Sequence, residues 1–390
     1  MNIISKNLNI LDYSLSLLAR KRFKNIAILV VYSTVIFLLA SFQLVSSALK
    51  ESATRILKTV PDITVQKMSG GRQVPFRSNP RESFKTIFGI ADVQDRIWGY
   101  YFDEKNGANY TIIGVKAETL SPALENGLEW GRLPQKEGEV VLSSSVAASM
   151  MLGGRKNFSL FRPDLTMKSF ATVGHFAEGS GLIADDVMLM SMHDAGDLFA
   201  MQQGELSDLL IKVGNPAEID TIAKKISSAI PGSRVITRKQ IQKTYDVVFS
   251  WRSGFGSVCL LTSLFAFIIL AWDRASGLSP EERKEMAILK VTGWQTNDII
   301  VLRFWESSCL ALISFLLGYS LAWLHVVYGG AVLFKPVLLG WSVLKPSYVL
   351  YPPFRLSDFL LIFTCSIIPY LVATIIPAWK SGMVRPDSVI

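Results

Sequence analysis

Charged residues are scarce in this chain: they make up 18% of its 390 residues, against about 25% in an ordinary soluble domain. Four intervals contain no Asp, Glu, Lys or Arg over a length that can cross a hydrocarbon core, which takes about 20 apolar residues. These intervals are 25–49, 253–272, 307–334 and 359–379. The pattern argues against a purely soluble protein, and we expect a membrane protein with four transmembrane α-helices.

Cysteine and histidine are also rare. The three cysteines all lie inside the apolar intervals, at Cys259, Cys309 and Cys365. They cannot form disulfides in an outer domain, and their spacing is not that of a zinc or iron site. The three histidines, His175, His193 and His325, are isolated in the sequence. We therefore predict neither a metal site nor a catalytic group of residues.

Two sequence features of other protein classes are missing. No phosphate-binding loop of the form G-x-x-x-x-G-K-[ST] occurs in the chain, so we expect no ATPase activity and no cofactor of its own. Any ATP-driven work would need a separate subunit that holds ATP and Mg. The first apolar stretch is not followed by a small-residue cleavage site, so we expect it to remain as an anchor.

Basic residues indicate the orientation, since loops rich in Lys and Arg stay cytoplasmic. Four of them directly precede the first apolar interval: Arg20, Lys21, Arg22 and Lys24. The predicted cytoplasmic segments are 1–24, 273–303 and 380–390, the outer segments are 50–252 and 329–357, and the spans are 25–49, 253–272, 304–328 and 358–379. The net charge of +8 is thus largely an orientation signal, and we expect no nucleic-acid partner.

The outer segment 50–252 has the pattern of a large α/β (α+β) extracytoplasmic domain inserted between the first two spans. Short apolar or alternating runs bounded by turn residues predict strands at 63–66, 110–115, 139–142, 170–173 and 209–213. Helical stretches separate some of them, at 144–152, 192–201 and 216–230. The length suffices for one domain or two lobes.

The segment before the first span predicts a short amphipathic helix. Apolar residues recur at helical spacing between polar ones, at Leu8, Leu11, Leu15 and Leu18. Two interpretations stay open: the helix lies on the inner leaflet, or it packs against the membrane helices.

The cytoplasmic loop 273–303 carries the clearest local signal. Ser279, Pro280 and Glu282 supply a hydroxyl N-cap, a proline at the first helical position and the acidic side of a capping box. A helix should start there and stop near Gly293, a natural left-handed C-terminal residue. Met286 and Leu289 cluster on one face of it. A short capped helix between two spans suits the docking of another protein.

The same loop carries a family resemblance. The run 282–294, ERKEMAILKVTGW, is similar to the E-R-x-x-E-I-x-x-L-[KR]-A-[LIV]-G stretch of the FtsX/MacB-type permeases of ABC transporters, the mechanotransmission type. The ending 377–386 resembles the family's P-A-x-x-A-x-x-x-x-P pattern. The outer segment adds matches to the MacB-type periplasmic domain at 113–115, 131–132, 138–142 and Ala147. The chain lacks the fused ATPase of MacB and has a larger outer domain than FtsX, so its layout resembles standalone members such as the lipoprotein-releasing permeases.

The resemblance implies a permease subunit of a bacterial inner membrane, multi-pass, with both termini cytoplasmic. It implies a second permease copy, in a homodimer or a related heterodimer, and a separate cytoplasmic ABC ATPase. A periplasmic or outer-membrane partner, and membrane lipids, complete the expected contacts. The residues expected to bind the ATPase are Glu282, Arg283, Glu285, Met286, Leu289, Lys290, Gly293 and Trp294.

The implied function is export or extraction of a substrate at the outer face, driven by movement of the outer domain. An alternative is an FtsX-like signalling or scaffold protein that regulates an extracytoplasmic hydrolase. Cargo would stimulate the ATPase of a transporter, whereas a protein partner alone would stimulate that of a regulator. The substrate stays open between lipoprotein, drug, peptide, haem and metal.

Copper handling is a minor alternative. On a strand, Met188, Met190 and Met192 would share one face beside His193, and soft thioethers suit Cu(I). Methionine is also a common filler of irregular cores.

Overall fold

The computed structural model describes residues 3–57, 61–77, 80–84, 86–116, 127–176, 186–248, 254–276, 280–334 and 350–382. The chain divides into two units. The helical unit comprises Met1–Leu49, Val248–Leu338 and Leu350–Ile390, and the sheet unit comprises Lys50–Val247 and Leu339–Val349.

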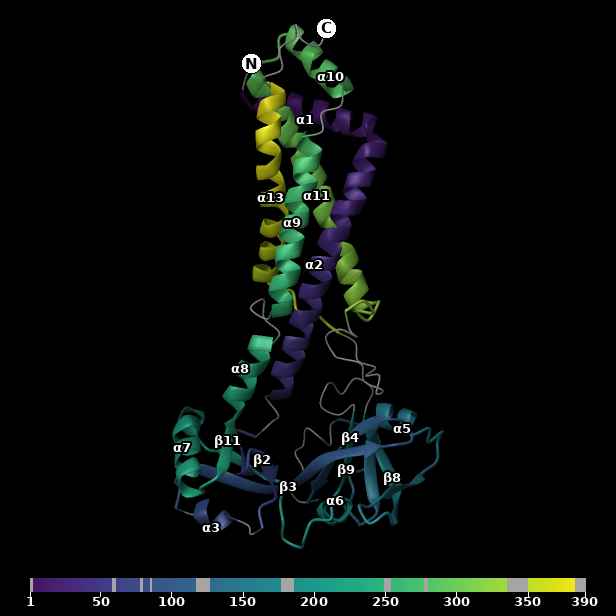
Figure 1. Cartoon of the computed structure of the whole chain (residues 1–390), viewed down its shortest axis with the longest axis vertical. Coiled ribbons are helices and arrows are strands. Elements are labelled where there is room, and N and C mark those ends of the chain that lie inside the picture. Colours follow the sequence, from purple (N-terminus) through teal and green to yellow (C-terminus); the bar gives the residue numbers. More distant parts are fainter. Residues whose placement is uncertain are drawn as a thin grey trace. The chain divides into compact units, whose positions relative to one another are not determined.

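Helices account for most of the described part of the helical unit (Figure 1). They are α1 (Ile3–Arg20), α2 (Arg22–Leu57), α9 (Gly254–Ser276), α10 (Pro280–Val291), α11 (Thr296–Val327) and α13 (Leu356–Gly382). The charge-free intervals 25–49 and 359–379 lie within α2 and α13, and α9 and α11 hold most of the other two. A single residue, Lys21, separates α1 from α2.

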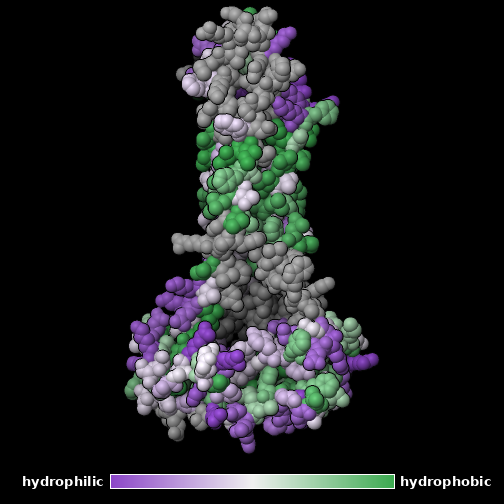
Figure 2. Space-filling view, in the orientation of Figure 1, coloured by the Kyte–Doolittle hydropathy of each residue, from purple (hydrophilic) through white to green (hydrophobic). Residues whose placement is uncertain are grey.

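Two helices among the described residues are long and apolar enough to cross a membrane: Arg22–Ser52 and Thr296–Val327. Shorter apolar stretches lie in α9 and α13, at Val258–Ile269 and Leu356–Val372. Large apolar side chains are exposed on all four helices, and Figure 2 shows this hydrophobic surface along the helical unit. A helix that is apolar on every side is stable only in a large core or in a membrane. The helices therefore indicate a membrane protein, while crossing by α9 and α13 stays a prediction.

Aromatic and small residues hold the helices together. The buried Tyr32 on α2 donates its hydroxyl proton to the carbonyl oxygen of Ser366 on α13 at 2.6 Å, and its ring contacts Phe267 on α9. A Cβ added to Gly318 on α11 would lie 2.7 Å from the carbonyl oxygen of Ser33 on α2. Such close approach through small residues is a common basis of helix association in membranes.

The sheet unit is a mixed sheet with short helices on it. In chain order its elements are β1 (Ile63–Ser69), β2 (Arg72–Val74), α3 (Arg81–Phe84), β3 (Ile90–Asp103), β4 (Ala108–Val115), β5 (Leu128–Gly131), β6 (Glu139–Ser143), α5 (Ser144–Ser149), β7 (Asn157–Phe161), β8 (Met167–Phe176), β9 (Val187–Ser191), α6 (Met192–Leu198), β10 (Asp208–Val213), α7 (Ile219–Ala229), β11 (Ser233–Thr237) and α8 (Arg238–Val248). All five predicted strands are confirmed, and helices occupy the three predicted helical stretches.

The described strands lie in the order β11-β1-β10-β3-β4-β9-β6-β8-β5, with β2 beside β1 and β7 beside β8. Most neighbours are antiparallel, but β4 with β9 and β6 with β8 are parallel. The long strand β3 joins two halves of the sheet, because its first part pairs with β10 and its second part with β4 (Figure 1). The two lobes allowed by the length of the segment are thus two halves of one sheet.

Strand β9 shows how the core is filled. Met188 and Met190 are fully buried in the main hydrophobic cluster, whereas Leu189 between them faces a second, smaller cluster. The predicted common face of these methionines is therefore confirmed, and that face is core. Met192 starts α6 instead of continuing the strand.

The outer-segment motifs have structural roles in this chain. A Cβ on Gly114 of β4 would lie 2.7 Å from the Cβ of Ala195, so glycine here lets α6 pack closely on the sheet. After Gly131 the chain turns, and Arg132 forms two hydrogen bonds to the carboxylate of Glu139, at 2.5 and 2.7 Å. The same carboxylate accepts backbone N–H groups of the intervening turn, residues 135 and 136.

Gly131→Ala should destabilise the sheet unit strongly. Gly131 has φ +88°, and its Cβ would lie 2.1 Å from the carbonyl oxygen of Val173 on β8, so the two strands must separate. We expect the free energy of unfolding to fall by about 3 kcal/mol or more. The matched control is Gly107→Ala, with φ +69° and open space around its Cβ, which should cost about 1–2 kcal/mol. Equal thermal unfolding midpoints for the two variants would contradict the prediction.

The contact between Arg132 and Glu139 predicts a pH dependence. The Arg132 guanidinium, with backbone N–H groups of the turn, lowers the pKa of Glu139 from 4.5 to about 2. The stabilisation is therefore fully present above about pH 4.5 and is lost as the pH falls toward about 2. Denaturant unfolding should show wild type more stable than Glu139→Gln at neutral pH, with the difference shrinking through that window. A difference that stays constant from pH 7 to about pH 2 would contradict this assignment.

Candidate partner-docking site

The helix predicted in the cytoplasmic loop is α10, and both of its predicted ends are found. It starts at Pro280 and ends at Val291, and Gly293 follows in the left-handed region with φ +97°. The N–H of Trp294 donates to the carbonyl of Leu289, and that of Gly293 donates to the carbonyl of Lys290. This pair of bonds is a Schellman motif, which satisfies the last carbonyl groups of the helix. The side chains of the predicted capping box lie outside the described residues.

One face of α10 is buried against α1 and the start of α11. Met286 is 1% exposed and Leu289 is 8% exposed. They form a hydrophobic cluster with apolar residues of the two other helices, Ile10, Leu17, Ile299 and Leu302. Burial of a Leu or Met side chain contributes about 1.5–3 kcal/mol, so this cluster supplies most of the attachment.

Charged groups hold α1 and α10 in register. The carboxylate of Glu285 on α10 accepts hydrogen bonds from Arg20 at the end of α1 and from Lys21, whose Nζ lies 2.8 Å away. The Glu285 side chain is 21% exposed. Partly exposed ion pairs contribute up to about 1 kcal/mol each, so they orient the helices and add little to the stability that the apolar cluster provides.

The other end of α1 is fastened to α11. The Nζ of Lys6 lies 2.6 Å from the carboxylate of Asp298, in the first turn of α11. The ring of Tyr13 packs against that of Trp294, which joins α10 to α11, with centroids 5.5 Å apart. α1 therefore runs across the end of the helical unit, where it is fastened to α11 near its start and to Glu285 of α10 at its end (Figure 1).

The expected ATPase-binding residues fall into three groups. Met286 and Leu289 face inward, and Glu285 is engaged by α1, so the structure places these three in the internal brace. Lys290, Gly293 and Trp294 lie at the C-terminal end of α10, where Gly293 is exposed. The side chains of Glu282 and Arg283 lie outside the described residues.

The outward face of α10 carries residues that are not in the expected ATPase-binding set. Ile288 is 51% exposed and Val291 is 65% exposed, with Lys284 also exposed on this side. A partner that grips α10 meets these side chains first. Their signal in the sequence was present, since Ile288 and Val291 are apolar, but nothing local showed that α1 covers the other face.

The amphipathic helix is confirmed as α1, but with a different buried face. Ile10, Ser14 and Leu17 are buried, whereas Leu8 is 59% exposed and Leu15 is 46% exposed. The helix thus has two apolar stripes, one packed on α10 and α11 and one exposed at Leu8 and Leu15. Both interpretations of the segment retain support: packing for one stripe and an interfacial position for the other.

Other residues considered from the sequence lie elsewhere. In α11, His325 has its Nδ1 3.2 Å from the hydroxyl of Ser41 and accepts the N–H of Leu333 at Nε2. His193 is largely exposed, with Glu137 3.5 Å away, while Met188 and Met190 are sealed in the core. Among the described residues, no group of three or more His, Cys, Asp or Glu could hold a metal ion.

Reversing the charge of Glu285 should loosen the attachment of α1. In Glu285→Lys the ammonium would face Arg20 and Lys21, so residues 3–20 should exchange amide hydrogens at least about tenfold faster, as loss of roughly 1.4 kcal/mol implies. Adding Arg20→Glu and Lys21→Glu should restore protection. The neighbouring, exposed Lys284→Glu serves as the control and should leave exchange unchanged. Failure of the compensating pair to restore protection would refute the charge contact.

No protein-family model matches the sequence, and no curated protein does. Solved structures similar to this chain include the following two. The extracellular domain of the noncanonic ABC-type transporter YknZ from Gram-positive bacteria is 12% identical, with 45% of this chain and 99% of that chain covered and a TM-score of 0.32. A domain of a Porphyromonas gingivalis protein assigned as a permease is 14% identical, with 45% and 86% covered and a TM-score of 0.25. Because both TM-scores are low, the functional argument rests on this chain's own residues.

Proposed function

We propose that this chain is the permease subunit of an ABC transporter, in which a separate ATPase docks on α10. ATP binding and hydrolysis, with Mg, take place on that subunit. The resulting movement of the ATPase is passed through α10 to the extracytoplasmic domain. This domain extracts or exports a substrate at the outer face of a bacterial inner membrane. The observation that carries the proposal is α10 itself: a short capped helix between two apolar helices, braced on one face and exposed on the other.

The exposed face has the composition of a docking surface. Apolar Ile288 and Val291 lie beside the cation of Lys284, which gives an apolar centre with a charged rim. The opposite face cannot serve directly, because its apolar side chains already pack on α1. In this proposal Met286 and Leu289 support the docking helix from behind.

A fixed helix is needed for force to be transmitted. A partner's movement biases the permease only if the contacted element moves as part of a larger body. α10 meets this condition, because Glu285 and the apolar cluster join it to α1, and only Lys21 separates α1 from α2. The 36 residues of α2 span about 54 Å, and the chain passes from the helical unit to the sheet unit within this helix.

The finer features of the proposal follow the family resemblance. We propose four spans with both termini cytoplasmic, pairing with a second permease copy, and classification in the FtsX/MacB mechanotransmission type. The exposed apolar side chains on all four long helices support the four spans, since each helix then offers lipids a compatible surface.

Photocrosslinking tests the docking surface. A benzophenone amino acid at Ile288 or Val291 should capture the coexpressed ABC ATPase, whereas the same probe at the buried Met286 should capture α1 of its own chain. A probe at the exposed Tyr100 of β3 is the control for non-specific capture. Capture of the ATPase from Met286 but from neither exposed position would contradict the proposed face, and absence of capture from all of them would contradict the function.

A further inference from the structure

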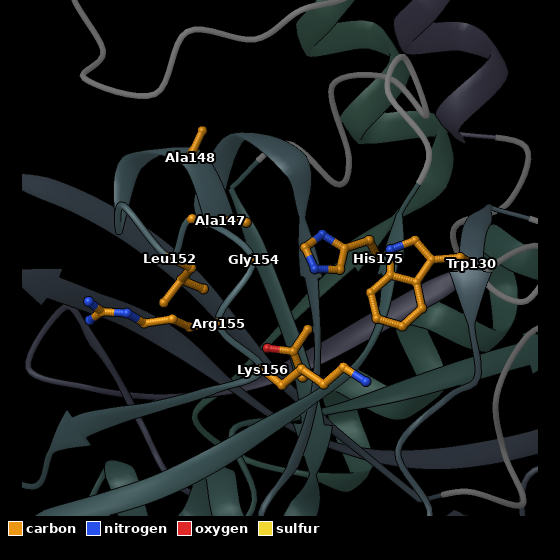
Figure 3. A pocket seen from close by; sticks show the side chains of 10 residues that line it. Trp130, Ala147, Ala148, Leu152, Gly154, Arg155, Lys156 and His175 are labelled. Atoms are coloured by element: carbon orange, nitrogen blue, oxygen red, sulfur yellow. The ribbon is translucent and has the colours of Figure 1, made fainter.

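The sheet unit has a cavity lined by residues of that unit. It has a volume of about 270 Å³ and lies between the α5–β7 turn and the strands β5 and β8 (Figure 3). Small-molecule sites start at about 300 Å³, so the space fits a ligand of one ring. Its walls come from Trp130 on β5, His175 and Thr172 on β8, and Ala147 and Leu152 beside the turn.

The two long walls of the cavity differ in chemistry. Trp130 and His175 are cross-strand partners whose rings stack with centroids 5.1 Å apart at 24°. Ala147 and the buried Leu152 form an aliphatic wall on the other side, as Figure 3 shows. An aromatic wall facing an aliphatic wall suits a flat apolar ring.

Two glycines with left-handed backbone form the turn beside the cavity. Gly153 and Gly154 have φ of +52° and +86°, and a Cβ on Gly154 would meet no atom within 4 Å. The turn is fixed below by the N–H of Thr172, which donates to the carbonyl of Lys156 at 2.7 Å. The cavity is therefore held by backbone bonds on one side and by a strand pair on the other.

Two of the described lining residues are charged, and both are cations. Lys156 and Arg155 are exposed, and neither has an acidic partner within 4 Å among the residues that the structure describes. Figure 3 shows Lys156 extending below the two rings, while Arg155 points to the opposite side. Burial lowers the pKa of His175, so its ring is neutral at neutral pH and the cation at the cavity is Lys156.

One wall group lacks a partner. Thr172 is 6% exposed, and its hydroxyl has no hydrogen-bond partner in the described part of the chain. A buried hydroxyl without a partner is uncommon, and a polar group entering the cavity could supply one after rotation of the side chain. We infer that the cavity binds a small aromatic carboxylate, whose ring lies between His175 and Leu152, with Trp130 stacked behind the imidazole, and whose anion pairs with Lys156.

The test uses the full chain in nanodiscs of zwitterionic lipid, with fluorine NMR of 4-(trifluoromethyl)benzoate as the probe. The neutral isostere, 4-(trifluoromethyl)benzyl alcohol, separates charge from ring stacking, and empty nanodiscs correct for lipid binding. Wild type should bind the benzoate more tightly than the alcohol. Lys156→Gln should lower the affinity for the benzoate about fivefold and remove the preference for the benzoate over the alcohol. Lys156→Arg should retain that preference.

Two further variants guard against misinterpretation. Arg155→Gln is the matched control, because this neighbouring cation points away from the rings, and it should bind like wild type. Leu152→Trp should fill the cavity and abolish binding of both probes, with some loss of the thermal midpoint because Leu152 packs in the main hydrophobic cluster. The inference is overturned if wild type shows no specific benzoate binding at millimolar concentration, or if Lys156→Gln and Arg155→Gln weaken it equally. None of these readouts depends on an ATPase, so they are independent of the proposed function.

Discussion

The attachment of α10 to α1 is the constraint on which the helical unit's proposed role depends. A helix of 12 residues is marginal in water by itself, so α10 holds its place only through tertiary contacts. Apolar burial of Met286 and Leu289 provides most of the free energy, and the carboxylate of Glu285 between two cations selects one register. Because the apolar term is non-directional, the charges are what prevent α1 from rotating or sliding on α10.

The ends of α10 could be predicted from the sequence, and its buried face could not. Pro280 and Gly293 act through local backbone chemistry, so they mark the helix wherever it lies. Which side of the helix is covered depends on α1, more than 260 residues earlier in the chain, as the pairing of Arg20 with Glu285 shows. The buried face of α1 was predicted wrongly for the same reason. The spacing of the leucines identifies an amphipathic helix, but Ile10 and Leu17 lie on a second stripe that only the packing reveals.

The sheet unit shows the same division between local and tertiary information. Strands with clean runs, such as β4 and β6, were predictable, whereas β3 mixes charged residues such as Asp92 and Arg96 with aromatic ones and gives no regular alternation. The presence of Arg96 in this strand is explained by the neighbouring β10. There the buried Asp208 accepts two hydrogen bonds from the guanidinium, at 2.9 and 2.6 Å. The cavity was invisible in the sequence, because Trp130 and His175 lie 45 positions apart and meet only through the pairing of β5 with β8.

The two apolar stripes of α1 limit the directions in which this helix can move. One stripe is fixed to α10 and α11, and the other, with Leu8 and Leu15, is compatible with the membrane interface, where an amphipathic helix lies in the plane of the bilayer. A helix held in this way resists movement normal to the membrane, since outward movement would expose the stripe of Leu8 and Leu15 to water and inward movement would take polar side chains into the hydrocarbon. It can move within the plane at lower cost, and Lys21 is then the point at which that movement becomes a change in the tilt of α2. Under the proposed function, a pull on Ile288 and Val291 would therefore reach α2 as tilting, while translation along its own axis would be opposed by the lipid contacts of α1.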